Sequence, residues 1–286
     1  MTAYNPAAKF EITVRDVEFL KTPARMLMAR VYQPQGAGPF PVLLDLHGGA
    51  WNNKDRFANA PMDEAAAKSG MLVVAIDMTL APVAPYPACV QEASYGIRWL
   101  KSKAAEWKGD ASTLGVLGSS SGGHVAELIG MRPNDARYNA IPLPQAPNLN
   151  DTVAYIATRS PISDPYARFQ QAEKMKRDHM IKNSTTFFNP WESIYEGNPQ
   201  QMLERKEKVS LPPLLIMQGA LDDNVIPVIQ QKFQAAYRAA GGECDLSVFE
   251  GATHEWVAEP SANTTRAHEM LKAFVAKQLQ AGRKAS

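Results

Sequence analysis

The chain has 286 residues, and its 45% hydrophobic content can fill the core of one large α/β domain. Its 30 lysines and arginines nearly balance 29 aspartates and glutamates, which excludes the strongly basic surface of a nucleic-acid-binding protein and favours neutral or apolar small molecules as partners. Cys89 and Cys244 lie far apart without CxxC spacing, so we predict neither a disulfide framework nor a metal site.

The N-terminal segment lacks the features of a secretory signal. No basic stretch is followed by an apolar one in residues 1–20, and no apolar run in the chain reaches membrane-spanning length. We therefore expect a cytoplasmic protein without a membrane span. The sequence leaves the oligomeric state open, with a homodimer among the alternatives.

The apolar residues predict a regular series of strands. Near-alternating apolar residues in 11–20 and 26–34 indicate an antiparallel pair at the start of the fold. Short, almost wholly apolar runs are typical of strands buried on both faces. Such runs occupy residues 41–49, 71–78, 113–119, 153–161 and 212–220.

Helical patterns lie between these strands. Apolar residues recur at three- and four-residue spacing in 86–108, around 229–237 and around 270–275, and a helical run follows Ser120. Because strands alternate with helices, we expect a mostly parallel sheet that is covered by helices on both sides.

One segment interrupts this alternation. Residues of about 165–208 are charged, with aromatic residues in the middle, and lie between two predicted strands where a short crossover would suffice. We predict a single domain over residues 1–286 with a helical lid inserted at about 165–208.

Three consecutive serines, Ser119 to Ser121, stand between an apolar run and a helical run. A nucleophilic serine at a sharp strand-to-helix turn needs small residues two positions before and after it, because larger side chains would clash there. Ser120 alone meets this requirement, with Gly118 and Gly122. The alternative is a Gly/Ser-rich turn or a phosphate-cradling loop.

A serine hydroxyl is a weak nucleophile unless a histidine base, oriented by a carboxylate, removes its proton. Asp222 and Asp223 follow the predicted strand at 212–220, and His254 follows another predicted strand. The order Ser120, Asp222, His254 is the one expected for a nucleophile on this kind of turn, and Asp223 competes with Asp222 as the acid.

The tetrahedral intermediate of acyl transfer also needs hydrogen-bond donors for its oxyanion. The glycine-rich stretch LDLHGGAW, residues 44–51, ends a predicted strand and can aim backbone N–H groups inward. We predict an oxyanion hole formed by Gly49, Ala50 and the N–H of Ser121. A tight turn without catalytic role is the alternative for the glycines.

The motifs HGGAW, GSSSGGH and DMTLAPVAPYPA resemble those of the α/β-hydrolase superfamily, in the esterase branch that includes hormone-sensitive-lipase-like and kynurenine-formamidase-like enzymes. The resemblance implies an α/β-hydrolase fold and hydrolysis of carboxylic esters through an acyl-enzyme, without metal or cofactor. The family's usual spacing selects Asp222, three residues after Gly219 and three before Val225. Ser119 and Ser121 replace the family's usual acidic residue and alanine.

Aromatic residues near these motifs are candidates for an apolar substrate pocket, although ordinary core packing is the alternative for each. They are Trp51, Phe187, Phe188, Trp191 and Trp256. His124 lies one turn beyond Ser120, and we expect it to pack because the proposed triad already has its base.

The expected function is that of a serine carboxylesterase for small to medium uncharged esters. An amidase, arylformamidase or peptidase of the same fold is the alternative. A non-catalytic ligand-binding member is less favoured, because such a protein is expected to lack a triad residue.

Overall fold

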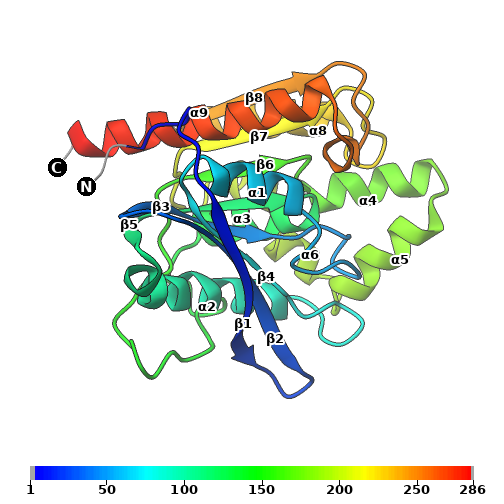
Figure 1. Cartoon of the computed structure of the whole chain (residues 1–286). Coiled ribbons are helices and arrows are strands. Elements are labelled where there is room, and N and C mark those ends of the chain that lie inside the picture. The colour runs from blue at the N-terminus through cyan, green and yellow to red at the C-terminus, as the bar shows by residue number, and fades with distance from the viewer. Residues whose placement is uncertain (1–3, 285–286) are drawn as a thin grey trace.

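The computed structural model describes residues 4–284, and within them eight strands form one twisted sheet with helices on both faces (Figure 1). The strand order is β1-β2-β4-β3-β5-β6-β7-β8. The strands are β1 (Ile12–Lys21), β2 (Met26–Pro34), β3 (Phe40–Leu46), β4 (Leu72–Ile76), β5 (Gly109–Ser119), β6 (Ile156–Arg159), β7 (Leu214–Gly219) and β8 (Cys244–Phe249).

The direction of the strands follows the predicted pattern. β1 pairs with β2, and β2 with β4, in antiparallel register, whereas β4, β3 and β5 to β8 pair in parallel. The strands β3, β4, β6 and β7 are buried at every position, which explains their mostly apolar sequence. The predicted α/β fold class and the opening antiparallel pair are confirmed.

The helices fill the predicted positions and add two that the sequence did not indicate, α1 (Ala60–Lys68) and the short η2 (Trp256–Ala258). The others are α2 (Ala88–Lys103), η1 (Ala104–Trp107), α3 (Ser121–Met131), α4 (Pro165–Lys174), α5 (Asp178–Phe187), α6 (Ser193–Glu196), α7 (Pro199–Glu204), α8 (Pro227–Ala239) and α9 (Ala262–Lys284). The helix α1 escaped prediction because two of its four buried residues, Ala66 and Ala67, are small and give little periodicity. No helix between residues 4 and 284 combines the length and apolar character that a membrane span needs.

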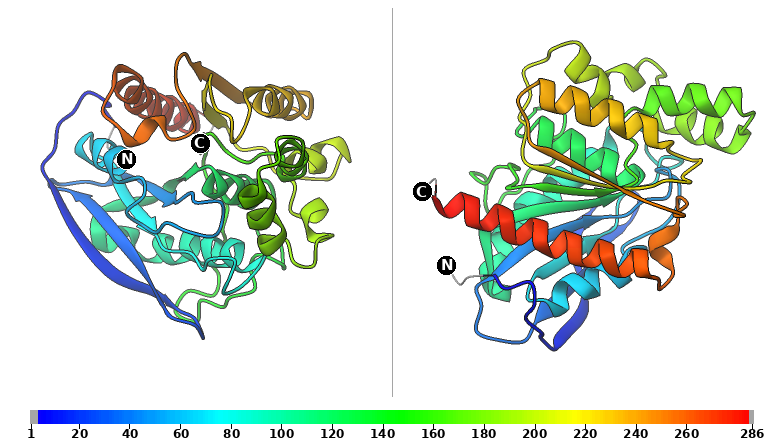
Figure 2. Two further views of the ribbon diagram at one scale, coloured as in Figure 1. Left: turned by 90° about the vertical axis from the view of Figure 1, so that its right-hand side faces the viewer. Right: turned by 90° about the horizontal axis from the view of Figure 1, so that it is seen from above.

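Two hydrophobic cores lie on opposite faces of the sheet. The helices α2, α3 and α8 contribute to one core, and α1 and α9 to the other. Figure 2 shows α8 and α9 on opposite sides of β7 and β8. Both faces of the parallel strands are therefore covered, as the sequence predicted.

The carboxyl ends of the parallel strands gather the segments that carry the candidate site residues. The HGGAW loop follows β3, Ser120 follows β5, Asp222 follows β7 and His254 follows β8. Because parallel strands all end at the same edge of a sheet, these residues meet there. The helices α4 to α7 lie between β6 and β7 in the chain, and α4 and α5 project from the body of the protein (Figure 1).

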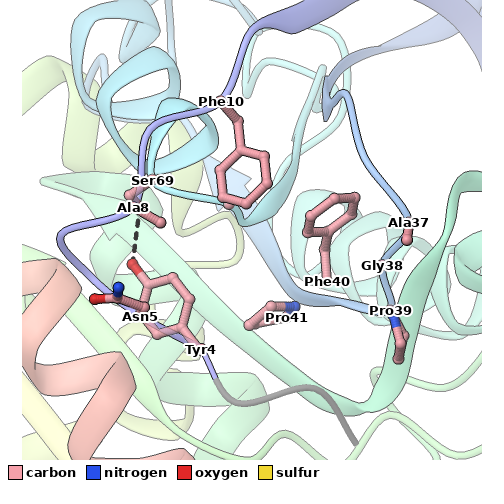
Figure 3. A pocket seen from close by; sticks show the side chains of 11 residues that line it. Tyr4, Asn5, Ala8, Phe10, Ala37, Gly38, Pro39, Phe40, Pro41 and Ser69 are labelled. Carbon is pink, nitrogen blue, oxygen red and sulfur yellow. Dashed lines mark hydrogen bonds between the residues drawn. The ribbon is translucent and has the colours of Figure 1, made fainter.

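A small apolar pocket lies at the other edge of the sheet, beside the first residue of β3. Its volume is about 260 Å³, and among its lining residues Phe10 and Phe40 meet edge-on with 5.5 Å between ring centroids (Figure 3). The Tyr4 hydroxyl and Ser69 Oγ close one side with a hydrogen bond of 2.8 Å. The pocket contains none of the candidate site residues.

The burial of α9 leads to a stability prediction. Leu271 is 1% exposed in the core under this helix. Truncation to alanine removes packed methyl groups and leaves a cavity, so Leu271→Ala is expected to lower the free energy of unfolding by about 2–5 kcal/mol. Urea denaturation measures this loss. The control Gln280→Ala, at an exposed position of α9, is expected to stay within about 0.5 kcal/mol of the unsubstituted chain. Equal effects of both changes would contradict the packing of α9.

Candidate active site

Ser120 lies at the tip of the turn between β5 and α3, with φ of 52° and ψ of −115°. At two positions of this turn there is no room for a Cβ, so only glycine fits. A Cβ at Gly118 would lie 2.5 Å from the carbonyl oxygen of Gly122, and a Cβ at Gly122 would lie 2.1 Å from that of Leu46. The spacing of the two glycines therefore identifies which of the three serines occupies the tip.

The structure brings Ser120, His254 and Asp222 into one hydrogen-bonded line. His254 Nε2 lies 3.0 Å from Ser120 Oγ, and His254 Nδ1 lies 2.8 Å from Asp222 Oδ2. Because an ionised carboxylate only accepts hydrogen bonds, Nδ1 carries the hydrogen and Nε2 offers its lone pair to the serine hydroxyl. This arrangement can transfer a proton from Ser120 to the imidazole.

Asp222 is buried and held in its ionised form. Its Oδ1 accepts hydrogen bonds from the backbone N–H groups of Asn224 and Val225 at 3.0 and 2.8 Å. Burial by itself raises the pKa of Asp222, but the hydrogen bond and charge of His254 and the N–H of Val225 together hold this pKa below its ordinary value. The carboxylate is thus available to stabilise a positive charge on the imidazole.

Asp223, the competing acid, points elsewhere. Its carboxylate accepts a hydrogen bond of 2.6 Å from Arg177 Nη2, and its side chain is 65% exposed. The structure therefore places Asp222, and not Asp223, beside His254.

The loop after β3 presents free backbone donors beside the turn between β5 and α3 that carries Ser120, hereafter the elbow. Gly49, Ala50 and Trp51 have φ values of 102°, 50° and 61°. Within the described residues, no hydrogen bond is donated by the backbone N–H of Gly49, Ala50 or Ser121. These groups can donate to an oxyanion, and the N–H of Ser121 also lies at the positive end of α3.

The side chain of Ser121 fixes this loop against the elbow. Its Oγ accepts a hydrogen bond of 3.1 Å from the backbone N–H of Trp51. The loop approaches closely, since a Cβ at Gly48 would lie 3.0 Å from the carbonyl oxygen of Ser119. Ser121 thus orients the candidate oxyanion loop through its side chain as well as offering its own N–H.

Ser119 faces the opposite way, into a buried polar network behind the elbow. Its Oγ donates to Asn59 Oδ1 at 2.9 Å and accepts from Arg159 Nε at 3.3 Å. Arg159 Nη1 donates to the backbone oxygen of His254 at 3.2 Å. Asn59 in turn donates to both oxygens of Asp45, at 2.9 and 3.1 Å. The network links the residue before Ser120 to the backbone of His254.

Asn59, Arg159 and Asp45 were not among the candidate residues in the sequence. Asp45 and Arg159 are charged residues inside otherwise apolar strands, β3 and β6. A charged residue at such a position needs buried polar partners. A charge inside an apolar strand was therefore the feature of the sequence that could have indicated this network. Asn59 carried no signal of its own, because it lies in a turn before α1.

Three of the candidate pocket residues pack together beside the oxyanion loop. The rings of Trp51 and Phe187 stack with 4.5 Å between centroids and 2° between planes, and Phe188 meets Trp51 edge-on. His124 joins this cluster: its Nδ1 accepts from Trp51 Nε1 at 3.3 Å, and its Nε2 donates to the carbonyl oxygen of Gly197 at 2.7 Å. Burial lowers the pKa of His124 to about 4, so it packs as a neutral side chain.

The other two candidate pocket residues lie apart from this cluster. Trp191 is half-buried and packs on Phe169 with 4.5 Å between ring centroids, within the inserted segment. Trp256 belongs to the core under α1 and α9, where it stacks on Phe249 at 4.4 Å. The expected grouping of Trp256 with the other aromatic residues is corrected accordingly, because the sheet separates the two cores.

The BD-FAE family model matches residues 30–236 of the chain. The esterase LipC of Mycobacterium tuberculosis is 28% identical over 84% of this chain and 59% of its own length. The chain therefore spans less than two thirds of that relative. Among solved structures, carboxyl esterase 2 of Tuber melanosporum aligns with a TM-score of 0.75 and 18% identity over 96% of this chain and 89% of that one. Butyrate-bound Est2 of Thermogutta terrifontis aligns with a TM-score of 0.71 and 20% identity over 94% of both chains.

The different contacts of the three serines lead to a stability prediction. Ser119→Ala leaves Asn59 Oδ1 and Arg159 Nε without this partner, and Ser121→Ala does the same to the buried N–H of Trp51. Each change is expected to lower the free energy of unfolding by about 1–3 kcal/mol. Within residues 4–284 the hydroxyl of Ser120 has a hydrogen bond only with the partly exposed imidazole of His254, so Ser120→Ala is expected to change the free energy of unfolding by less than about 1 kcal/mol. Urea denaturation of the three variants tests this order, which an equal loss in all three would contradict.

Proposed function

The chain belongs to the BD-FAE family of the α/β-hydrolase superfamily, and we propose that it hydrolyses carboxylic esters with Ser120 as the nucleophile. The hydrogen-bonded line from Asp222 through His254 to Ser120, with distances of 2.8 and 3.0 Å, carries the proposal. LipC and LipM of Mycobacterium tuberculosis, named as an esterase and a probable carboxylic ester hydrolase, support the reaction class.

The first half of the reaction forms an acyl-enzyme. Ser120 Oγ attacks the ester carbonyl carbon while His254 Nε2 takes the serine proton. Negative charge develops on the carbonyl oxygen, which accepts hydrogen bonds from the N–H groups of Gly49, Ala50 and Ser121. When the carbon–oxygen bond to the leaving group breaks, the imidazolium gives its proton to the departing alcohol.

The second half returns the enzyme to its starting state. A water molecule gives a proton to His254 and attacks the acyl carbon, and the same N–H groups again stabilise the oxyanion. The intermediate collapses to a carboxylic acid, and Ser120 Oγ recovers its proton from His254. Asp222 stays ionised throughout and stabilises the imidazolium in each half.

We further propose that the inserted segment forms a wall of the substrate site. Trp51 continues the oxyanion loop, and its contacts with Phe187 and Phe188 join α5 to that loop. Both phenylalanines are fully covered by protein, which suits a supporting role. The half-buried Trp191 is then the aromatic side chain left to contact the substrate.

The nucleophile is tested by covalent labelling. A fluorophosphonate is expected to add to Ser120, because the reagent forms its adduct with an activated serine. Ser120→Ala is expected to lose both labelling and nearly all turnover of p-nitrophenyl butyrate, while its thermal melt stays that of a folded protein. Peptide mass spectrometry locates the adduct, and an adduct on Ser119 or Ser121 would refute the assignment.

The acid is tested by two matched substitutions at neighbouring positions. Asp222→Asn is expected to lower kcat by about 10²–10⁴-fold, because His254 loses its required tautomer and the partner of its positive charge. Asp223→Asn removes only an exposed ion pair with Arg177 and is expected to change kcat by less than about threefold. Steady-state kinetics on p-nitrophenyl butyrate measure both, and the reverse order would move the acid to Asp223.

A further inference from the structure

Arg168, on the inserted helix α4, is a buried cation that pairs with no carboxylate of residues 4–284. Its side chain is among the largest that are fully buried, at 1% exposure. Nε and Nη2 donate to Asn224 Oδ1 at 3.0 and 2.7 Å, whereas Nη1 is buried and has no hydrogen-bond partner in the described part of the chain. Burial lowers the pKa of Arg168 to about 10, so the group is charged at neutral pH. Such a charge is costly unless an anion compensates it.

The guanidinium lies between the two loops that flank Ser120. On one side it holds Asn224, whose N–H donates to Asp222 Oδ1 at 3.0 Å. On the other side its Cζ lies 6.0 Å from the ring centroid of Trp51, the residue that continues the oxyanion loop. An ester that places its carbonyl carbon at Ser120 and extends its acyl group between these two loops would bring its distal end near Arg168, which contacts a residue of each loop.

The protein's own carboxylates do not satisfy Arg168. Asp222 attracts the guanidinium electrostatically, but its oxygens already accept hydrogen bonds from His254, Asn224 and Val225. Arg177 offers a contrast, because it also reaches this loop from the inserted segment and pairs with Asp223 at the surface. The loop therefore gives Arg168 a neutral amide oxygen as its hydrogen-bond acceptor. The positive charge of Arg168 can then pair with the anionic group of a bound ligand.

We propose that Arg168 binds a carboxylate carried by the acyl group of the substrate, so that half-esters of dicarboxylic acids are the preferred substrates. The proposal rests on the proposed ester hydrolysis. It revises the expectation of uncharged esters. That expectation came from the near balance of charges in the sequence, which describes the electric field of the whole protein and does not detect a single cation buried beside the active site. Since protein atoms cover Nη1, a small displacement of α4 or of the Arg168 side chain accompanies binding.

The test compares p-nitrophenyl half-esters of succinic, glutaric and adipic acid with their methyl-capped diesters. Spontaneous hydrolysis is measured with Ser120→Ala and subtracted. In the unsubstituted enzyme, kcat/KM is expected to be at least about tenfold higher for the best half-ester than for its capped counterpart, chiefly through KM. The length of the diacid that gives the highest kcat/KM measures the distance from Ser120 to the bound carboxylate at Arg168.

Three variants separate substrate binding from support of the acid loop. Arg168→Met is expected to lower the ratio of the two kcat/KM values by about tenfold or more, and Arg168→Lys to retain part of it. Asn224→Ala, which removes the amide oxygen but keeps the charge, is expected to preserve a preference for half-esters. Arg177→Met is the matched control from the same segment and is expected to leave the ratio unchanged.

Each outcome bears on one proposal or the other. Turnover of the capped esters without preference for half-esters would overturn the role of Arg168 and leave ester hydrolysis standing, even if Arg168→Met did not fold. An equal loss on both substrates in Arg168→Met and Asn224→Ala would assign Arg168 to positioning of the acid loop alone. Absence of turnover on every ester by the folded, unsubstituted chain would refute the proposed function itself.

Discussion

The close approach of three backbone segments at the turn after β5 sets the geometry on which the candidate site depends. Gly118 and Gly122 let the chain reverse beside Ser120, and Gly122 also lets the turn approach the end of β3, where a Cβ would lie 2.1 Å from the carbonyl oxygen of Leu46. Because β3 and β5 are neighbours in the sheet, this contact brings the oxyanion loop next to the serine. A side chain at either glycine would push these backbone segments apart. The N–H donors of the loop after β3 would then lie farther from Ser120.

Ser119 and Ser121 secure this geometry from two sides. Ser121 ties the elbow to the loop through the N–H of Trp51, and Ser119 connects it through Arg159 to the backbone of His254. Hydrogen bonds of this kind are strong inside a protein because water does not compete for the groups, and each broken bond leaves a buried polar atom unpaired. The residues beside Ser120 thus limit the movement of the candidate oxyanion loop and of His254.

The inserted segment contacts both sides of the same site. Phe187 stacks on Trp51 beside the oxyanion loop, while Arg168 and Arg177 bind the loop that carries Asp222. A displacement of this segment would therefore act on the proposed substrate wall and on Asp222 together. The two contacts also hold Arg168 in the protein interior beside Asp222. A buried charge acts strongly on a bound substrate, whereas a charge at the surface would be screened by solvent.

Local chemistry in the sequence determined the strands, most helices and the order of the candidate triad. Apolar runs mark strands buried on both faces, and the glycines around Ser120 identify the turn because no other residue fits there. The resemblance to the family favoured Asp222 over Asp223, and only the tertiary structure placed Asp222 beside His254 and Asp223 beside Arg177, because adjacent residues differ in the direction in which the folded loop points them. The tertiary structure also decided the placement of Trp256 and the partners of Ser119, Arg159 and Arg168. Those contacts join segments far apart in the chain, and hydrophobic periodicity carries no information about which distant polar groups will meet.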